Sequence, residues 1–253
     1  MNFFIDDCDE RNNFLITLLK NKKYCVFTLK DIKNAEPGDY FIFSPAKKIT
    51  QNDLINLPNN SIIFCGNISN EVRENLKNKE FIYKNYMEDE IFAIKNANLT
   101  AEAVLSIIIS SSKKSIYKNN ILIFGAGRIS KALAILFNKL GLSFSICNYH
   151  KKNYENAYIF TDNCLFADEY KNCANSFDIV VNTIPYNHLT TEDCLLFNNG
   201  TIYIETASNM GIVEDIKNFI IIKAPALPKK YSPESAAEIM KDFIIRSKKW
   251  KLV

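Results

Sequence analysis

One short segment, 121–130, combines the residue types and the spacing that could bind a phosphate. It reads ILIFGAGRIS, so an apolar run is followed at once by Gly125 and Gly127. The next residues, 131–140, carry apolar side chains at helical spacing. In a strand–turn–helix unit, the first glycine allows a sharp turn and the second lets the backbone approach a pyrophosphate, which the start of the helix then binds. We therefore predict a dinucleotide site here, against the alternative of an ordinary turn between a strand and a helix.

The other residues of this turn bear on how a phosphate would be held. Ser130 stands where the dinucleotide fingerprint has its third glycine, and it is small enough for close packing of the helix on the strand. The guanidinium of Arg128 matches phosphate geometry, although a surface arginine at a helix start is the alternative. We expect Arg128 and Ile129 to contact the cofactor together with the two glycines.

The residues after the next predicted strand, 141–147, indicate which dinucleotide is bound. An NAD site usually has an acidic residue about 20 residues past the glycines, where it holds the ribose hydroxyls. Here the chain has no acid before Glu155. The polar and basic residues present suit a 2′-phosphate, so NADP is favoured over NAD, although a solvated lysine pair on a loop is the alternative. The residues expected to contact the cofactor here are Asn148, Tyr149, His150 and Lys151.

Two later strands, predicted over 177–182 and 201–204, end in further polar residues. The carboxyl ends of parallel strands face the ligand crevice of an open α/β sheet. We therefore expect the residues at these two strand ends to lie beside the cofactor. They are Asn182, Thr183, Ile184, Pro185 and Ala207.

Few side chains offer acid–base or carboxylate-binding chemistry. Glu102, expected near the start of a helix over 100–110, and Glu205, on the rim after a strand, are candidates for a general base. The alternative for each is a helix cap or a solvated acid. Ser208 and Asn209 could hydrogen-bond a substrate carboxylate or the nicotinamide amide, and ordinary loop chemistry is their alternative. We assign Glu102, Ser208 and Asn209 as the candidate catalytic residues.

The elements that must position these residues alternate between strands and short helices along the whole chain. This alternation predicts an α/β protein with two doubly wound parallel-sheet domains, the second being a Rossmann dinucleotide-binding domain. The expected boundaries are 1–99 for a flavodoxin-like first domain and 100–231 for the Rossmann domain, with a last helix over 232–253 that packs back on the first domain. No glycine-rich turn follows Ile5, so we do not expect a second nucleotide site.

Three segments carry further expectations of secondary structure. Residues 91–94 are apolar and resemble a strand, and 158–160 resemble another short strand. The segment 224–228 contains two prolines and is predicted to be a stiff loop.

Composition narrows the function classes. A chain of 253 residues with 47% hydrophobic residues can form two globular domains, and a net charge of +3 gives no indication of nucleic-acid binding. We expect no signal peptide, no membrane span and therefore a cytoplasmic protein. The seven cysteines form no C-x-x-C pair, which fits a reducing compartment, and the two histidines show no metal-ligand spacing, so no metal is expected.

Several short motifs in the same order resemble those of the family of dipicolinate synthase A subunits, which belong to a sporulation enzyme of endospore-forming bacteria. The similarity runs from about Ser61 to Phe243. The matched segments are 65–70 (CGNISN), 100–103 (TAEA), 125–130 (GAGRIS), 182–185 (NTIP), 205–212 (ETASNMGI) and 224–228 (APALP).

This resemblance implies an enzyme that forms dipicolinate from a dihydro- or hydroxytetrahydro-dipicolinate precursor with a nicotinamide dinucleotide. It also implies a small dicarboxylate substrate, a partner that is the flavoprotein-like B subunit, and action in the mother-cell cytoplasm; a homo-oligomer is a further expectation. The residues that it places near substrate are Ser69, Asn70, Thr100, Leu227 and Pro228, although Ser69 and Asn70 could instead cap the helix that follows.

The chain departs from the family pattern at several positions. Asn209 stands where the family has Arg or Lys, Glu234 replaces a lysine, and Ala226 and Lys229 replace glycines. The first departure favours an alternative, another NADP-dependent reductase acting on a small hydroxy or keto acid. The scarcity of acid–base residues favours a second alternative, a non-catalytic subunit that binds nucleotide.

Overall fold

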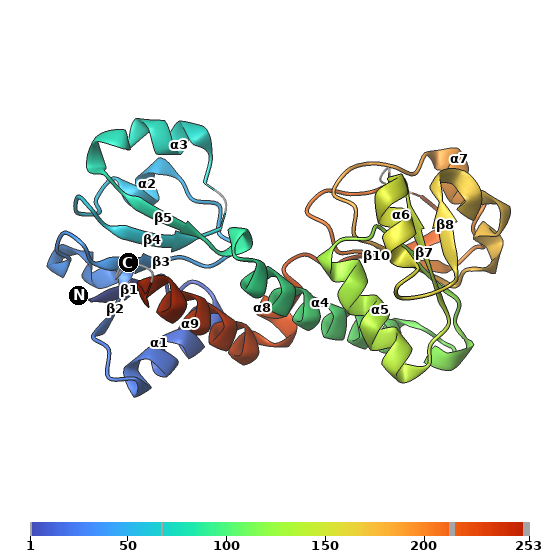
Figure 1. Ribbon diagram of the computed structural model, residues 1–253, viewed down its shortest axis with the longest axis horizontal. Coiled ribbons are helices and arrows are strands. Elements are labelled where there is room, and N and C mark those ends of the chain that lie inside the picture. Colours follow the sequence, from blue (N-terminus) through green and yellow to red (C-terminus); the bar gives the residue numbers. More distant parts are fainter. Residues whose placement is uncertain (1, 67, 213–215, 250–253) are drawn as a thin grey trace. The chain divides into compact units, whose positions relative to one another are not determined.

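The computed structural model describes residues 2–66, 68–212 and 216–249 and divides them into two compact units (Figure 1). Unit 1 contains the described residues up to Asn96 and those from Pro228 onward, and unit 2 is Ala97–Leu227. The divisions therefore fall a few residues before the sequence-based boundaries at 99 and 231.

Unit 1 is built on a parallel sheet of five strands. Its strand order is β2-β1-β3-β4-β5, the flavodoxin-like order, in which the topological switch point lies between β1 and β3. The strands are β1 (Phe3–Ile5), β2 (Val26–Thr28), β3 (Tyr40–Ile42), β4 (Ile62–Cys65) and β5 (Ile82–Asn85).

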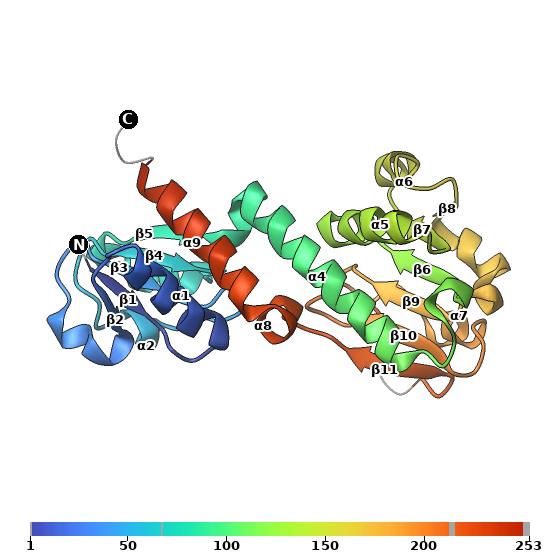
Figure 2. The same cartoon turned by 90° about the horizontal axis from the view of Figure 1, so that it is seen from below.

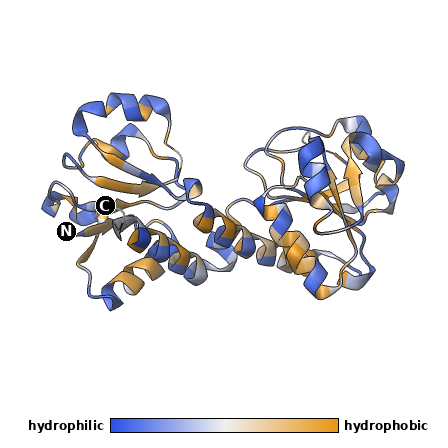
Figure 3. Cartoon of the chain, viewed as in Figure 1, coloured by the Kyte–Doolittle hydropathy of each residue, from blue (hydrophilic) through white to orange (hydrophobic). Residues whose placement is uncertain are grey.

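Helices cover both faces of this sheet, because its strands are apolar on both sides. Leu15 and Leu19 of α1 (Glu10–Asn21) and Phe243 of α9 (Pro233–Lys249) bury one face, and the two helices lie side by side in Figures 1 and 2. Leu54 of α2 (Gln51–Leu54), together with Val72 of α3 (Asn70–Asn75), covers the other. Figure 3 shows the apolar strands between more polar helices such as α3.

Unit 2 is built on a parallel sheet of six strands in the order β11-β10-β9-β6-β7-β8. Counted within the unit, this is the Rossmann order 3-2-1-4-5-6 read from the other edge, and its switch point lies between β6 and β9. The predicted fold class, two doubly wound domains with a Rossmann domain second, is confirmed. The strands are β6 (Ile121–Phe124), β7 (Phe144–Asn148), β8 (Cys164–Phe166), β9 (Ile179–Asn182), β10 (Thr201–Glu205) and β11 (Phe219–Lys223).

Alternate residues of these strands enter two cores. Ile121 and Ile123 pack with helices α4 (Glu90–Ser111), α5 (Arg128–Leu140) and α6 (Lys151–Ala157), whereas Leu122 and Phe124 pack with the 3-10 helix η5 (Ala167–Asn172) and α7 (Thr191–Leu195). The remaining short helices are η1 (Leu29–Asn34), η2 (Lys77–Lys79), η3 (Tyr86–Glu88), η4 (Ile116–Lys118), η6 (Ala174–Ser176) and α8 (Leu227–Tyr231).

Three predictions of secondary structure were wrong. Residues 91–94 form the first turns of α4, because the Asp89 side chain accepts a hydrogen bond from the Phe92 N–H (2.7 Å) and the apolar residues that follow are buried at helical spacing. Residues 158–160 form turns that end α6, and the edge strand is β8. The expected stiff loop over 224–228 ends early, because Leu227 and Pro228 open α8.

Helix α4 also corrects the expectation that no segment is long enough to span a membrane. Among the described residues, it is the one helix long and apolar enough to cross a membrane by length and composition, and 56% of its most apolar stretch is buried inside the fold. Its apolar side chains enter the cores, with Phe92 in unit 1 and Val104 and Ile108 in unit 2.

Candidate functional site

The glycine turn lies at the switch point of unit 2, between the ends of β6 and β9. Gly125 has a φ of +105°, and a Cβ placed there would lie 2.3 Å from Thr183 Oγ1. Thr183 follows β9 and is held by the end of β6, since its N–H and its hydroxyl both donate to the Phe124 carbonyl at 3.0 and 2.8 Å. Both backbone conformation and space therefore require glycine at position 125.

The start of helix α5 faces open space. Gly127 is its N-cap residue, no side chain caps the helix there, and a Cβ at Gly127 would meet no atom within 4 Å. Ser130, at the position of the third glycine, is buried and donates its hydroxyl to the Gly125 carbonyl at 2.7 Å, so it holds the turn closed. Arg128 is exposed in the first turn, followed by half-buried Ile129. A helix N-terminus left accessible in this way can bind an anion.

The end of β7 carries the residues predicted to choose the dinucleotide. Asn148 is buried, and its Oδ1 accepts a hydrogen bond from the His150 N–H at 2.9 Å, which shapes the turn into α6. His150 and Lys151 are exposed. The Tyr149 ring points inward instead, stacked on Phe124 with ring centroids 6.5 Å apart. The tyrosine is thus part of the floor of the site.

Two loops, 182–189 after β9 and 205–212 after β10, form the remaining rim and are called the rim loops below. The Thr206 N–H and hydroxyl both donate to the Asn182 carbonyl, at 3.1 and 2.6 Å. The N–H groups of His188 and Leu189 donate to the Gly211 carbonyl. These bonds join the rim loops along their length.

Glu205 lies beneath the rim loops with 3% of its surface exposed. Its two carboxylate oxygens accept hydrogen bonds from Asn182 Nδ2, both at 2.9 Å, and from the N–H groups of Ala207 (2.9 Å) and Gly211 (2.8 Å). The Tyr203 hydroxyl donates to it at 3.1 Å. Burial raises the pKa of Glu205, against the effect of these donors. Both oxygens are engaged, so the alternative considered for Glu205, a solvated acid, does not apply.

The other predicted residues on the rim differ in availability. Asn182 is fully buried, and its amide holds Ile184 through bonds to the Ile184 carbonyl and from the Ile184 N–H, both at 3.0 Å. Ser208 and Asn209 are exposed, and Asn209 Nδ2 donates to the Pro185 carbonyl at 3.1 Å. The structure therefore brings the residues predicted after β6, β7, β9 and β10 to one edge of the sheet. Asn182 is buried there and holds the backbone of Ile184.

The remaining predicted residues lie outside this edge. Glu102 and Thr100 are in the interior of α4, which begins at Glu90, so the expected position of Glu102 at a helix start was wrong. Glu102 is exposed beside α5, in a cavity of about 200 Å³. Ser69 is the N-cap of α3 in unit 1, and its hydroxyl accepts a bond from the Val72 N–H at 3.3 Å. Three more predicted substrate contacts are Asn70, the first residue of α3, and Leu227 and Pro228, the first two residues of α8.

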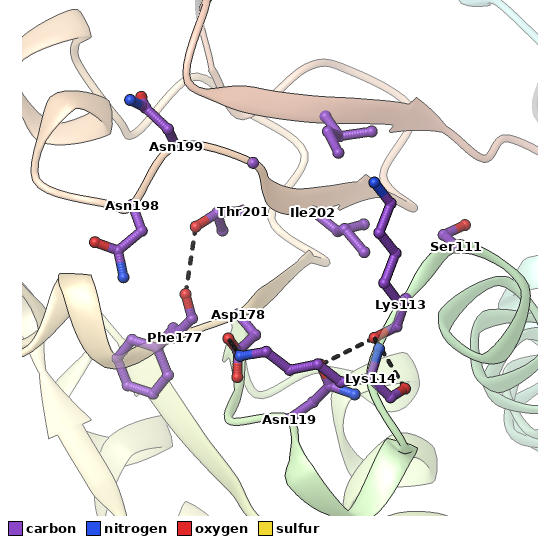
Figure 4. Close-up of a pocket in the computed structure, with 13 residues that line it drawn as sticks. Ser111, Lys113, Lys114, Asn119, Phe177, Asp178, Asn198, Asn199, Thr201 and Ile202 are labelled. Atoms are coloured by element: carbon purple, nitrogen blue, oxygen red, sulfur yellow. Dashed lines mark hydrogen bonds and ion pairs between the residues drawn. The ribbon is translucent and has the colours of Figure 1, made fainter.

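Larger cavities in unit 2 occupy the opposite, amino ends of the strands. One of about 400 Å³ lies between the starts of β9, β10 and β11, where Lys114 points to Asp178 and the Thr201 hydroxyl donates to the Phe177 carbonyl (Figure 4). Parallel sheets bind ligands at their carboxyl ends, so this cavity does not compete with the glycine turn. Among the described residues, no group of three or more His, Cys, Asp or Glu side chains could hold a metal ion.

Thr206 and Gly211 lie in the segment 205–212 that the sequence singled out, although without a role, whereas Tyr203 of β10 and His188 were not identified. His188 packs under the rim against Phe124, with ring centroids 4.9 Å apart. One signal was present in the sequence: the chain has only seven glycines, so a glycine in the loop after β10 was informative. A Cβ at Gly211 would lie 2.4 Å from Asn182 Nδ2 and 2.7 Å from the Tyr203 hydroxyl.

Comparisons of sequence and of structure both find A subunits of dipicolinate synthase. No family model matches this chain. The A subunit of dipicolinate synthase from Bacillus subtilis (strain 168) is 25% identical over 206 residues, covering 79% of this chain and 69% of that protein. The crystal structure of the dipicolinate synthase A subunit from Bacillus halodurans superimposes with a TM-score of 0.85, at 17% identity and over 97% of each chain.

A more distant structure shares the same fold. A transhydrogenase from Sinorhizobium meliloti superimposes with a TM-score of 0.71, at 12% identity, over 97% of this chain and 92% of that one. The fold of two α/β units is therefore shared with this transhydrogenase. In sequence and in fold, this chain resembles the A subunit of dipicolinate synthase, and the resemblance predicted from its motifs is confirmed.

Proposed function

We propose that this chain is an NADP-dependent oxidoreductase subunit of the dipicolinate synthase type, with the dinucleotide bound at the switch point of unit 2. The observation that carries the proposal is the accessible N-terminus of α5. Gly125 is packed tightly against Thr183, while Gly127 leaves free space in front of the helix. This combination admits a pyrophosphate and fits the group by geometry.

The residues of the glycine turn and of the rim loops would bind different parts of the cofactor. The backbone at Gly127 and the guanidinium of Arg128 would hold the pyrophosphate. The backbone of Thr183–Pro185, Ala207 and the exposed side chains of the second rim loop would hold the nicotinamide half. When bound, the nicotinamide ring supplies the hydride acceptor.

The end of β7 supports NADP over NAD. His150 and Lys151 are exposed, and Lys152 follows them on the first turn of α6. None of the described residues forms an ion pair with Lys151 or Lys152, so both ammonium groups are available to a 2′-phosphate. The buried Asn148 gives the turn its shape without adding the negative charge that favours a free ribose hydroxyl.

We propose a pyridine-dicarboxylate precursor as substrate. Oxidation of a dihydro precursor to dipicolinate removes one hydride, for which a bound nicotinamide would be the acceptor, and one proton, for which a base is needed. A hydroxytetrahydro precursor would also lose one water. Ser208 and Asn209 are exposed on the rim and could hydrogen-bond a carboxylate. The residues that we further propose to act on substrate are Glu102, Ser69, Asn70, Thr100, Leu227 and Pro228.

The resemblance also supports a partner subunit and a cellular location for this reaction. The relatives are named as subunits, so we propose that this chain acts with a flavoprotein-like B subunit, in the mother-cell cytoplasm during sporulation. Self-association into a homo-oligomer is part of the same proposal.

One observation favours a second candidate function, a subunit that binds nucleotide without catalysis. Glu205 is the acidic side chain at the end of β10, and both of its oxygens are engaged by donors of the rim. Asn209, where relatives are expected to carry a cation, is bound to the Pro185 carbonyl. A reductase of another hydroxy or keto acid is the outcome to consider if the dinucleotide is turned over with a different substrate.

A turnover assay separates these functions. The purified chain, alone and with the B subunit of a relative, is mixed with NADP⁺ and the dipicolinate precursor, and NADPH and dipicolinate are measured. Equal amounts of both products support the proposal. Binding of NADP⁺ without turnover under either condition would favour the non-catalytic subunit, and turnover with hydroxy acids alone would favour the other reductase.

A further inference from the structure

Glu205, at the end of β10, is a buried carboxylate surrounded by hydrogen-bond donors. Four groups donate to its two oxygens, and each oxygen accepts at least two bonds. All four are donors, which matches an ionised carboxylate, because an ionised carboxyl group accepts only. Three of them come from the rim loops, namely Asn182, Ala207 and Gly211.

A buried charge at this place is costly. Transfer of a carboxylate from water to the interior of a protein disfavours folding unless donors compensate it, and an apolar residue of similar size is often tolerated as well or better. Burial raises the pKa of Glu205, because it disfavours the charged form of the carboxyl group. Fold stability alone therefore gives a weak reason for this residue, whereas a requirement for fixed loop geometry gives a strong one.

The bonds of Glu205 continue to the exposed rim. Asn182 Nδ2, which donates to Glu205, also donates to the Ile184 carbonyl at 3.0 Å. The bond from the Ala207 N–H to Glu205 fixes the backbone immediately before Ser208. The positions 183–185 and 207–209 of the two rim loops are thus tied to one carboxylate.

Gly211 shows how closely this arrangement is packed. A Cβ there would lie 2.4 Å from Asn182 Nδ2, 2.7 Å from the Tyr203 hydroxyl and 2.7 Å from His188 Cε1. The loop after β10 can only sit on the carboxylate because position 211 has no side chain.

We propose that Glu205 is a positioning residue, whose carboxylate fixes the rim loops in the arrangement that binds the nicotinamide half of the dinucleotide. This role rests on the proposed function. It assigns the two ends of the cofactor to separate structures: the glycine turn and the end of β7 hold the adenosine half, and the Glu205-centred rim holds the nicotinamide half.

The test compares two ligands on the full chain. NADPH contains both halves, whereas 2′-phospho-ADP-ribose lacks the nicotinamide. In Glu205→Gln an amide NH₂ must face N–H donors, so we expect NADPH to bind on the order of tenfold more weakly while the affinity for 2′-phospho-ADP-ribose changes less than about twofold. Gly211→Ala strains the same arrangement without removing the charge, and we expect the same split between the ligands.

A matched control removes a buried polar side chain of unit 2 away from the rim. Asn218 is buried before β11 and donates to the carbonyls of Cys194 and Phe197. Asn218→Ala should lower the melting temperature as Glu205→Gln does, but it should leave the ratio of the two affinities unchanged.

The outcomes are distinct. Loss of affinity for both ligands to the same degree in Glu205→Gln, or no loss for either, would overturn the positioning role while leaving the proposed function intact. If the glutamine variant does not fold, Gly211→Ala decides by the same criterion. Failure of the unmodified chain to bind either ligand would overturn the proposed function itself.

Discussion

Each of the two sheets has a switch point at which a ligand could bind. The helix that starts there is capped by a side chain in unit 1 and is not capped in unit 2. Both are doubly wound, and each has a switch point where a strand is followed by a helix, α1 in unit 1 and α5 in unit 2. The N-terminus of α1 is capped by the carboxylate of Asp9, which accepts the Arg11 N–H. The N-terminus of α5 begins at Gly127 and has no side-chain cap.

A buried ion pair closes the switch point of unit 1. Arg11 Nη2 lies 2.7 Å from Asp9 Oδ2 and 2.7 Å from the Ser44 hydroxyl, and all three side chains are buried. Although burial raises it, hydrogen bonds from Arg11 and Ser44 hold the pKa of Asp9 below its usual value. Here the protein supplies its own anion to the helix terminus, so topology alone does not make a phosphate site; the residue types at the strand end decide it.

The largest effect is expected from breaking the ion pair of unit 1. Arg11→Met leaves the buried Asp9 carboxylate without its cation, so the free energy of unfolding should fall by about 3–5 kcal/mol. Chemical denaturation followed by circular dichroism measures it. Lys30→Met, which removes an exposed ion pair with Asp7, is the control and should barely move the midpoint. NADPH affinity of the folded Arg11 variant should be unchanged, and a tenfold loss would contradict the contrast between the units.

The next largest effect is expected from adding a side chain at Gly125, in the glycine turn of unit 2. Gly125→Ala forces a Cβ toward Thr183 Oγ1 at a φ of +105°, so we expect a loss of about 1–3 kcal/mol in stability and at least about tenfold in NADPH affinity. Gly141→Ala is the matched control, because Gly141 also has a positive φ (+67°) but contacts nothing within 4 Å at the far end of α5. It should lose stability only. Equal NADPH affinity in both variants would place the nucleotide elsewhere.

A smaller effect concerns the choice between dinucleotides. Lys151→Ala removes one exposed ammonium group at the end of β7, so NADPH should bind several-fold more weakly while NADH binding stays within about twofold. Fluorescence titration measures both affinities. Lys113→Ala, at the amino end of the same sheet, is the control and should alter neither. A parallel loss of NADPH and NADH affinity would argue against a 2′-phosphate contact.

The smallest effect is a pH dependence from His188. Burial lowers the pKa of His188, partly offset by its contact with the Tyr186 carbonyl and by the charge of Asp193, and its Nε2 has no hydrogen-bond partner among the described residues. The unfolded chain therefore takes up this proton first, and the associated stability is present above the ordinary histidine pKa of about 6.5 and lost as pH falls below it. Denaturation at a series of pH values should show this loss, and His188→Phe should reduce it. An unchanged slope in the variant would rule the histidine out.

The sequence predicted the parts of the molecule that depend on local pattern. Glycine spacing and apolar runs identified the turn at Gly125 and the doubly wound parallel sheet around it, because a Rossmann unit is largely specified by strand, turn and helix. The same pattern misassigned 91–94, where isoleucines favour a strand, because the helix start there is set by Asp89 and by packing in two cores.

Roles that depend on long-range contacts could not be predicted. In the sequence, Glu205 is an acidic residue at a strand end with no sign that it is buried. Its donor Asn182 lies 23 residues away, on a strand that only the fold brings beside it. In the sequence, Ser130 is a departure from the third glycine of the fingerprint. In the structure, its hydroxyl donates a hydrogen bond to the Gly125 carbonyl and so stabilises the turn.

The most direct test of the dinucleotide site is a calorimetric titration of the unmodified chain with NADPH and with NADH. We predict saturable binding of one NADPH per chain and an affinity for NADH that is weaker on the order of tenfold. Absence of heat and of saturation with both ligands would contradict a dinucleotide site at the switch point of unit 2.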